Sequence, residues 1–228
     1  MSALWIWAAG ALGAYFLGSI PFGLLIGLAR GVDIRQHGSR NIGATNAGRV
    51  LGRRWGVLCF ALDVAKGLVP VLTVGWLTGA LAASHGGRLA PLDALPWLAI
   101  VACAIGGHMF SVFLRFKGGK GVATGFGALL GLWPVLTLAA LIALGVWIIC
   151  IRATRIVSIS SIAAASSLPV STLLLALARS IRPGTTLALT LSLALLAALV
   201  IWKHRANIAR LRAGTEPRVG APRATQAR

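Results

Sequence analysis

The chain has 228 residues, of which 57% are apolar and 11% are charged, and its mean hydropathy is +0.86. Soluble domains contain about 45–50% apolar and about 25% charged residues, so this composition excludes an ordinary soluble domain and indicates a polytopic membrane protein. The 22 lysines and arginines against 4 acidic residues give a net charge of +18. In a soluble protein this charge would suggest nucleic acid. Here the basic residues lie between apolar runs, so we attribute them to membrane orientation and expect no nucleic-acid partner.

Six apolar runs follow one another along the chain, and several exceed the roughly 20 residues that span a bilayer core. They are Leu4–Ala29, Trp55–Ala83, Leu95–Leu114, Val122–Ile151, Ile156–Ala178 and Thr185–Trp202. Gly18-Ser-Ile-Pro21 predicts a kink in the first run. Between the runs, basic residues concentrate in Arg30–Arg54, which has six arginines and one aspartate, and in Arg115–Gly121. The tail Lys203–Arg228 has seven basic residues and one acid.

The distribution of basic residues predicts the orientation of the chain. No basic residue precedes the first run and six follow it, so the N-terminus should lie outside and Arg30–Arg54 in the cytoplasm. The segment Arg115–Gly121 and the tail should be cytoplasmic too, which requires an even number of crossings after Gly121. Three runs remain, and a break at Gly131-Leu-Trp-Pro134 resolves the conflict by dividing Val122–Ile151 into two short helices.

The resulting prediction is an all-α helix bundle with seven transmembrane helical segments, at least one of them short or broken. A break at Ser166-Ser-Leu-Pro169 satisfies the same parity, but it would leave Arg152 and Arg155 outside. We prefer the break at Trp133-Pro134 for that reason.

Three polar clusters then share the cytoplasmic side: Gly38–Arg49, Arg115–Gly121, and His204 with Asn207. Glycines let backbone N–H groups converge on an anion. Arg49 offers a planar fork for phosphate and Lys120 a point charge, and a helix that begins near Val122 would direct its N-terminal dipole at the same anion. His204 and Asn207 are three residues apart, so they share one face of a helix. In the alternative interpretation, Ser39, Asn41 and Asn46 only form turns.

Other polar residues have two interpretations. Asp63 and Lys66 can pair within the membrane, where an uncompensated charge is costly, and either shape the pocket or bind substrate directly, so both are candidate substrate-binding residues. We expect His37, His85 and His108 to be incidental or structural. The three cysteines lie in apolar runs and form no metal-ligand pattern. With so few carboxylates and no G-x-S-x-G elbow, we expect neither a metal nor a cofactor.

Several ordered motifs resemble a known family, the bacterial acyl-phosphate-dependent glycerol-3-phosphate acyltransferases of the PlsY type. The resemblance covers nearly the whole chain. The motifs are Gly18-Ser-Ile-Pro-Phe-Gly23, Ser39-Arg-Asn-Ile-Gly-Ala-Thr-Asn46 with Arg49, Leu62-Asp-Val-Ala-Lys-Gly67, Gly107-His-Met-Phe-Ser-Val-Phe113, Phe116-Lys-Gly-Gly-Lys-Gly-Val-Ala-Thr124 and His204-Arg-Ala-Asn-Ile208. One departure is Arg40, which stands where the family typically has glycine.

The resemblance implies a seven-helix bundle in the bacterial inner membrane. Residues 1–202 would form the bundle with active-site loops 30–54 and 115–121. In the cytoplasmic tail, residues 203–228, the part 203–214 would belong to the site, while the composition of 215–228 predicts disorder. The implied reaction moves a fatty acyl group from acyl phosphate to the 1-hydroxyl of sn-glycerol 3-phosphate, with lysophosphatidic acid and phosphate as products, the first step of phospholipid biosynthesis. Contact with the peripheral enzyme that makes acyl phosphate is also expected.

Matched residue by residue, the resemblance implies catalytic and phosphate-binding roles for Ser39, Arg49, Lys120, His204 and Asn207. It implies that the surrounding substrate pocket is formed by Asn41, Gly43, Thr45, Asn46, Lys117, Gly118, Gly119 and Gly121. The proton acceptor stays open between His204 and a phosphate oxygen of a bound substrate.

Two other classes of function compete with an enzyme. A transporter or channel for organic phosphates would use the same basic cavity without chemistry, but internal repeats and a site at the bilayer midplane are not evident in the sequence. A non-catalytic protein that binds anionic lipid through Arg30–Arg54 and the tail needs only charge, which leaves the glycines and asparagines unexplained.

Overall fold

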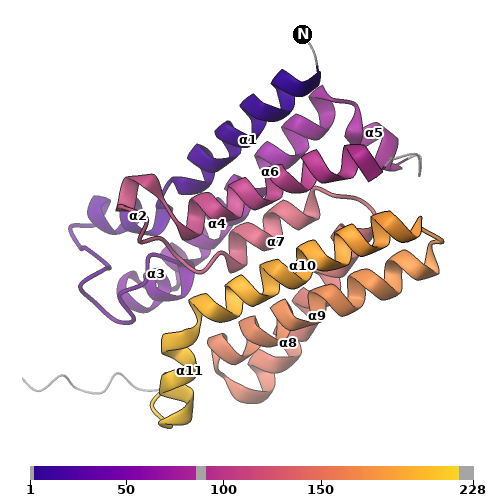
Figure 1. Cartoon of the computed structure of the whole chain (residues 1–228). Helices are drawn as coiled ribbons and strands as arrows, with labels where there is room; N and C mark the ends of the chain where they lie inside the picture. The colour runs from indigo at the N-terminus through magenta and orange to yellow at the C-terminus, as the bar shows by residue number, and fades with distance from the viewer. Residues whose placement is uncertain (1–2, 86–90, 221–228) are drawn as a thin grey trace, which may run out of the picture.

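The computed structural model describes residues 3–85 and 91–220, and its regular elements in these ranges are all helices (Figure 1). They are α1 (Ala3–Ser19), α2 (Phe22–Ala29), α3 (Ala44–Leu51), α4 (Arg53–Leu77), α5 (Ala80–His85), α6 (Pro91–Met109), the 3₁₀ turn η1 (Val112–Leu114), α7 (Val122–Leu130), α8 (Val135–Thr154), α9 (Val157–Ala178), α10 (Pro183–Lys203) and α11 (Arg205–Arg212). The predicted all-α class is confirmed.

Six helical segments in the described residues are long and apolar enough to cross a membrane. They are Leu4–Ala29, which combines α1 and α2, and the segments Arg53–Leu77, Ala94–Leu114, Val135–Thr154, Val157–Ala178 and Pro183–Lys203. The predicted kink in the first span is a break, since α1 ends at Ser19 and α2 begins at Phe22, directly after Pro21. Together with α7 these spans match the seven predicted segments, but α7 is too short to count as a candidate span, so the number seven stays a prediction.

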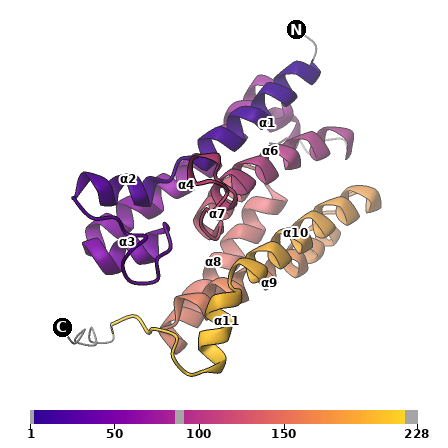
Figure 2. The same cartoon turned by 60° about the vertical axis from the view of Figure 1, so that its left-hand side comes forward.

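The spans form two groups that the short helix α7 joins. Helix α1 packs against α6 and α4, while α8, α9 and α10 pack against one another in order (Figures 1 and 2). Helix α7 packs most closely on α4 and also contacts α6 and α8. Within the first group, Trp97 is fully buried and its Nε1–H donates to the Val71 carbonyl at 2.9 Å, which ties α6 to α4.

The break at Trp133-Pro134 is confirmed, because α7 ends at Leu130 and α8 begins at Val135. Pro169 lies inside the continuous helix α9, so the alternative break is wrong. The expectation of two short helices is only half right. Helix α7 has 9 residues, but α8 has 20 and is long enough to span the membrane, because it continues past Ile151 to Thr154.

Two predicted boundaries also differ from the structure. Residues Arg30–Arg54 are not one loop, since α3 lies within them and α4 already begins at Arg53. Helix α3 is amphipathic and buries Asn46 and Ala47 on one face, where the side chain of Asn46 is satisfied by hydrogen bonds to the preceding loop. The second span ends at Leu77, where Gly79 adopts a positive φ of 76° and separates α4 from α5. Of the predicted loop His85–Ala94, residues 86–90 lie outside the described residues; the rest is wrong, since His85 ends α5 and α6 already begins at Pro91.

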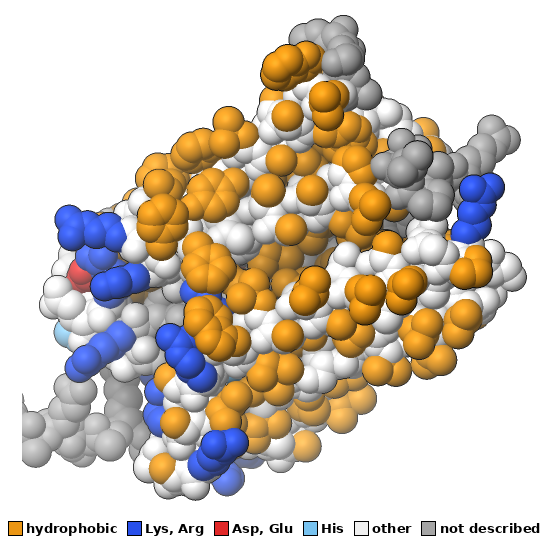
Figure 3. Space-filling view, in the orientation of Figure 1, with side chains coloured by type: hydrophobic (Ala, Val, Ile, Leu, Met, Phe, Trp, Pro, Cys, Tyr) orange, Lys and Arg blue, Asp and Glu red, His pale blue; other side chains and the backbone are white. Residues whose placement is uncertain are grey.

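On the face shown in Figure 3, most lysine and arginine side chains gather at one end of the bundle, and the surface between the two ends is mostly apolar. At this end lie α2, α3, the segment before α7, and α11 (Figures 1 and 2). We name it the basic end. The three polar clusters identified in the sequence therefore meet at the same end of the bundle, as the charge pattern predicts.

Candidate functional site

Two cavities open at or near the basic end. The smaller, which we name the polar cleft, has a volume of about 420 Å³. It is lined by Ser39, Asn41, Phe110, Phe116–Lys120, Trp202, Lys203, Arg205–Asn207 and Arg210. The polar cleft thus brings together residues from all three sequence clusters.

The larger cavity, which we name the apolar groove, has a volume of about 810 Å³. It is lined by Ala44, Thr45, Gly48, Arg49, Arg53, Gly56, Val57, Phe60, Gly121–Ala123, Gly125, Phe126, Leu129, Ala140, Ala143, Leu144, Trp147, Val157, Ser161, Ala164, Ala165, Leu168, Leu196, Val200 and Arg218–Gly220. Along α9 its lining runs from Val157 to Leu168, which corresponds to about 17 Å of helix, or roughly half of a bilayer core.

The two cavities adjoin at the start of α7. Lys120 lines the polar cleft and the next residue, Gly121, lines the apolar groove. Gly121 caps α7 in the left-handed conformation, so the unpaired N–H groups of the first helical turn lie at this junction. A helix N-terminus carries partial positive charge and favours an anion beside it.

The glycine loop before α7 packs tightly on a buried histidine. Gly119 N–H donates to the His108 carbonyl at 3.0 Å, and a Cβ on Gly119 would collide with His108 Nε2. A Cβ on Gly118 would collide with the His108 carbonyl oxygen. Both positions therefore require glycine, and this close approach fixes the backbone that carries Lys120. His108, which the sequence left as incidental or structural, has a structural role in the loop.

Lys120 belongs to a chain of hydrogen bonds that ends on the one glutamate of the protein. Its Nζ donates to Asn207 Oδ1 at 2.5 Å, and Asn207 Nδ2 donates to Glu216 Oε1 at 2.6 Å. Burial lowers the pKa of Lys120 to about 8; Glu216 opposes this shift, while Arg210 and Arg49 add to it. Lys120 is therefore mostly protonated at neutral pH, and among the described residues no carboxylate forms an ion pair with it.

Glu216 is itself held by three donors. Besides Asn207, Ser158 Oγ donates to Oε1 at 2.7 Å and Arg210 Nε to Oε2 at 2.7 Å. Although burial alone would raise the pKa of Glu216, these hydrogen bonds hold it below its usual value, so the side chain is a carboxylate at neutral pH.

Because Glu216 and Val219 are held by these and by backbone hydrogen bonds, the predicted disorder from residue 215 on does not apply to 215–220. Residues 221–228 lie outside the described residues.

His204 is buried and lines neither cavity. Its Nδ1 lies 2.8 Å from the Val200 carbonyl, which can only accept, so Nδ1 carries a proton. Burial lowers the pKa of His204 to about 4, and the charge of Lys120 contributes. The ring is neutral at pH 7, and Nε2 is a hydrogen-bond acceptor.

In the first motif, the two asparagines shape the loop. Asn46 is buried, accepts from Ser39 N–H at 2.8 Å and donates to the Ile34 and His37 carbonyls. Asn41 Oδ1 accepts from Gly43 N–H at 2.9 Å, which is a local turn. Neither Asn46 nor Gly43 lines a cavity, whereas Ser39 and Asn41 line the polar cleft.

Thr45 and Arg49 lie on α3 and face the apolar groove, not the polar cleft. The predicted site residues are therefore divided between two cavities. Ser39, Asn41, Lys117–Lys120 and Asn207 belong to the cleft, and Thr45, Arg49 and Gly121 to the groove.

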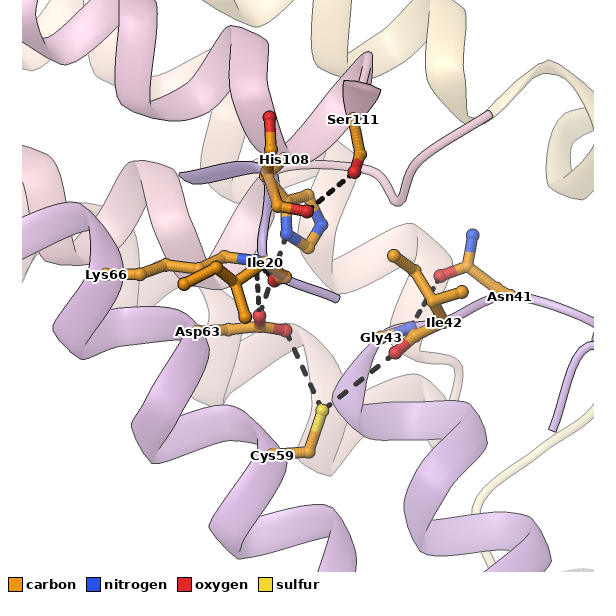
Figure 4. Close-up of polar contacts among 10 residues, drawn as sticks. Ile20, Asn41, Ile42, Gly43, Cys59, Asp63, Lys66, His108 and Ser111 are labelled. Carbon is orange, nitrogen blue, oxygen red and sulfur yellow. Dashed lines mark hydrogen bonds and ion pairs between the residues drawn. The ribbon is translucent and has the colours of Figure 1, made fainter. Parts of the chain in front are cut away.

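Asp63 and Lys66 form an ion pair of 2.9 Å in which both side chains are buried (Figure 4). Lys66 Nζ also donates to the Ile20 carbonyl at 2.7 Å, at the break between α1 and α2. His108 Nδ1 lies 3.7 Å from Asp63 Oδ1, and Cys59 Sγ lies 3.9 Å from the Ile42 carbonyl. Because neither Asp63 nor Lys66 lines a cavity, their geometry favours the structural interpretation over substrate contact.

Several residues of the two cavities were not predicted from the sequence. Lys203, Arg205 and Arg210 line the polar cleft, Arg53 and Arg218 line the groove, and Glu216 supports Asn207. Of these residues only Glu216 had a recognisable sequence signal, because it is the one glutamate in a chain with 22 lysines and arginines. Within the described residues, no three histidine, cysteine or acidic side chains are grouped as metal ligands would be.

Comparisons with known proteins agree with this arrangement. The sequence model of the family described as glycerol-3-phosphate acyltransferase matches residues 8–214. The chain belongs to this family, in its PlsY type. A glycerol-3-phosphate acyltransferase of Trichlorobacter lovleyi is 45% identical over 97% of the chain and 100% of that protein. One of Geobacter metallireducens is 48% identical over 92% of the chain and 95% of that protein.

Solved structures of the acyltransferase PlsY have the same fold. The crystal structure of its glycerol 3-phosphate form matches with a TM-score of 0.75 and 35% sequence identity, and covers 96% of both chains. The lysophosphatidic acid form matches with a TM-score of 0.72 over the same shares. The chain is thus an integral membrane glycerol-3-phosphate acyltransferase of the PlsY type.

Proposed function

We propose that the protein transfers a fatty acyl group from acyl phosphate to the 1-hydroxyl of sn-glycerol 3-phosphate, giving 1-acyl-sn-glycerol 3-phosphate and inorganic phosphate. One observation carries this proposal. A polar, basic cleft and a long apolar groove adjoin at Lys120 and Gly121. The two substrates of the reaction differ in the same way, since one is small and polar and the other carries an alkyl chain.

In this assignment the acyl chain lies in the apolar groove, with its phosphate near Arg49 and the N-terminus of α7. Glycerol 3-phosphate occupies the polar cleft, where lysines and arginines bind its phosphate. Its 1-hydroxyl then reaches the acyl carbonyl at the junction of the cavities. An acyl phosphate is already activated, so holding the two reactants together in the right orientation supplies much of the catalysis.

The hydroxyl oxygen forms a bond to the carbonyl carbon, and the bond from that carbon to the phosphate oxygen breaks. Lys120 and the backbone N–H groups at the start of α7 stabilise the negative charge that develops on the carbonyl oxygen and on the departing phosphate. No covalent intermediate with the protein is required, and the site residues include no thiol.

The proton of the hydroxyl goes to the departing phosphate. A general base works best when its pKa is near the operating pH, and the pKa of His204 is lowered to about 4. Phosphate monoesters have a pKa of about 6 and are therefore the stronger base. His204 instead bonds through Nδ1–H to the Val200 carbonyl, one turn earlier in the chain, at the junction of α10 and α11.

The decisive experiment uses purified protein in lipid with acyl phosphate and radiolabelled glycerol 3-phosphate. We expect labelled lysophosphatidate and one equivalent of inorganic phosphate. The same assay with acyl-CoA and with acyl-carrier protein identifies the donor, and we expect no product from either. Absence of product from every donor contradicts the proposal, and uptake of unmodified glycerol 3-phosphate into vesicles would favour a transporter.

We further propose that the protein lies in the bacterial inner membrane with the N-terminus outside and the basic end in the cytoplasm. The peripheral enzyme that produces acyl phosphate would then meet the mouth of the groove on that side. Reporter fusions after Arg155 and after Gly214 should both report a cytoplasmic location, whereas a fusion after Arg182 should report the outside. A periplasmic signal after Arg155 would contradict this orientation.

A further inference from the structure

The chain beyond α11 crosses back over the mouth of the apolar groove. We name Thr215–Gly220 the C-terminal strap. Glu216 anchors its first part to α9 through Ser158 and to α11 through Asn207 and Arg210. Val219 N–H donates to the Arg155 carbonyl at 2.7 Å, where α8 passes into α9. Arg218 lies between these two anchors, so its backbone is held on both sides.

The last three residues of the strap line the groove, although they are far from its other walls in sequence. Arg218 is one of three basic residues in that lining, with Arg49 from α3 and Arg53 from the first turn of α4. All three come from segments at the basic end, whereas the rest of the lining is mostly alanine, leucine, valine and aromatic residues. The groove therefore has a cationic mouth and an apolar body.

In the part of the chain that the structure describes, no acidic side chain neutralises Arg218. Glu216, two residues earlier, is already bound by three donors, and within the described residues Arg218 makes no ion pair or side-chain hydrogen bond. An exposed guanidinium beside an apolar cavity is suited to a ligand that has an anionic head and an apolar tail. A guanidinium can also bind two phosphate oxygens at once.

We propose that Arg218, held by the Glu216 and Val219 anchors, is a binding residue for the phosphate of the acyl donor. The inference rests on the proposed function, because it takes an acyl phosphate as the occupant of the groove. It goes further by assigning a donor-specific contact to the C-terminal strap, which lies outside all of the family motifs. Glycerol 3-phosphate in the polar cleft does not meet this side chain, since Arg218 does not line the cleft.

The test is a comparison of Michaelis constants for the two substrates. In Arg218→Ala, we expect KM for acyl phosphate to rise about tenfold, as the loss of one charge-assisted contact predicts. KM for glycerol 3-phosphate should stay within about twofold of wild type. Arg218→Lys should recover part of the donor affinity. We expect inorganic phosphate, a product of the proposed reaction, to compete with acyl phosphate and to inhibit Arg218→Ala more weakly than wild type.

Two further variants serve as controls. Arg212→Ala removes an exposed arginine at the end of α11 that lines neither cavity, and it should leave both Michaelis constants unchanged. A chain that ends at Pro217 keeps the Glu216 anchor but lacks Arg218, and it should reproduce the donor defect. A rise in both Michaelis constants of Arg218→Ala, or a rise in neither, would overturn the inference. A wild-type protein that makes no product from acyl phosphate would contradict the proposed function instead.

Discussion

The polar cleft and the apolar groove adjoin at two consecutive residues, yet different kinds of structure build them. The cleft is formed by loop residues, by the end of α10 and by α11, and hydrogen bonds such as that of Lys120 with Asn207 hold its side chains. The groove is formed by the faces of packed helices, and its space exists because Ala140, Ala143 and Ala164 are small. Binding in the cleft therefore depends on hydrogen-bond geometry, and binding in the groove on volume.

This contrast predicts which kinetic constant each substitution changes. Changes in the cleft should alter the Michaelis constant for glycerol 3-phosphate. Changes in the groove should alter the use of the acyl donor and its chain length. The junction at Lys120 should matter to both.

The largest effect is expected at that junction. Lys120→Met removes the ammonium but keeps the length of the side chain, and kcat/KM should fall about 100-fold to 1,000-fold for both substrates. Lys117→Met, in the same loop with an exposed side chain, is the matched control and should cost much less. If both variants lost activity equally, the special position of Lys120 would be refuted.

The next effect tests the close packing of the glycine loop. In Gly119→Ala the new methyl group collides with His108, so the free energy of unfolding should fall by about 1–3 kcal/mol. The shifted loop should raise KM for glycerol 3-phosphate about 10-fold to 100-fold. Gly145→Ala, on α8 with open space around the new methyl group, should be neutral or stabilising. Thermal unfolding and steady-state kinetics measure both outcomes. An unchanged KM for glycerol 3-phosphate would show that the glycine loop does not contribute to acceptor binding.

The pH dependence of acceptor binding tests the charge of Lys120 in the cleft. A lysine is charged below its pKa, and the pKa of Lys120 is about 8. The charged fraction, and with it the affinity for glycerol 3-phosphate, should fall about tenfold between pH 7 and pH 9, while the substrate phosphate stays dianionic because its pKa is about 6. In Lys120→Arg the acceptor KM should be nearly constant over this range, since arginine keeps its charge. An equal decline in both proteins would assign the titration to another group.

A smaller effect is expected when the groove is narrowed. Ala164→Phe places a ring in the space that Ala164 leaves, so kcat/KM for long-chain acyl phosphates should fall about tenfold, while short-chain donors and the acceptor KM change little. Ala163→Phe, one residue away and outside the groove lining, is the control. A uniform loss over all chain lengths would show that the groove does not hold the alkyl chain.

The smallest effect concerns Arg40, which lies outside both cavities. Its φ of 57° is in the left-handed region, where a side chain is disfavoured and glycine is not. Arg40→Gly should relieve that strain but increase the entropy of the unfolded chain, so the free energy of unfolding should change by less than about 1 kcal/mol. Both Michaelis constants should stay near wild type. A large loss of activity would show that the arginine side chain contributes to a cavity.

Much of the fold could be predicted from composition and charge. Apolar runs of spanning length and the positive-inside pattern located the spans, and the parity of basic segments placed the helix break at Gly131–Pro134. The boundaries of α3 and α4 were missed, because a short amphipathic helix among arginines has too little apolar sequence to be recognised. The motif residues were found, but their division between two cavities was not.

The sequence by itself determined that the protein is a membrane helix bundle, that its cations gather at one end, and which motifs bear on phosphate chemistry. These properties depend on local composition and on the cost of placing charge in lipid. Only the tertiary structure decided that Arg49 faces the groove while Ser39 faces the cleft, and that Glu216 supports Asn207. Such relations join residues that are distant in the chain, and the packing of α3, α7 and α11 at the basic end creates them.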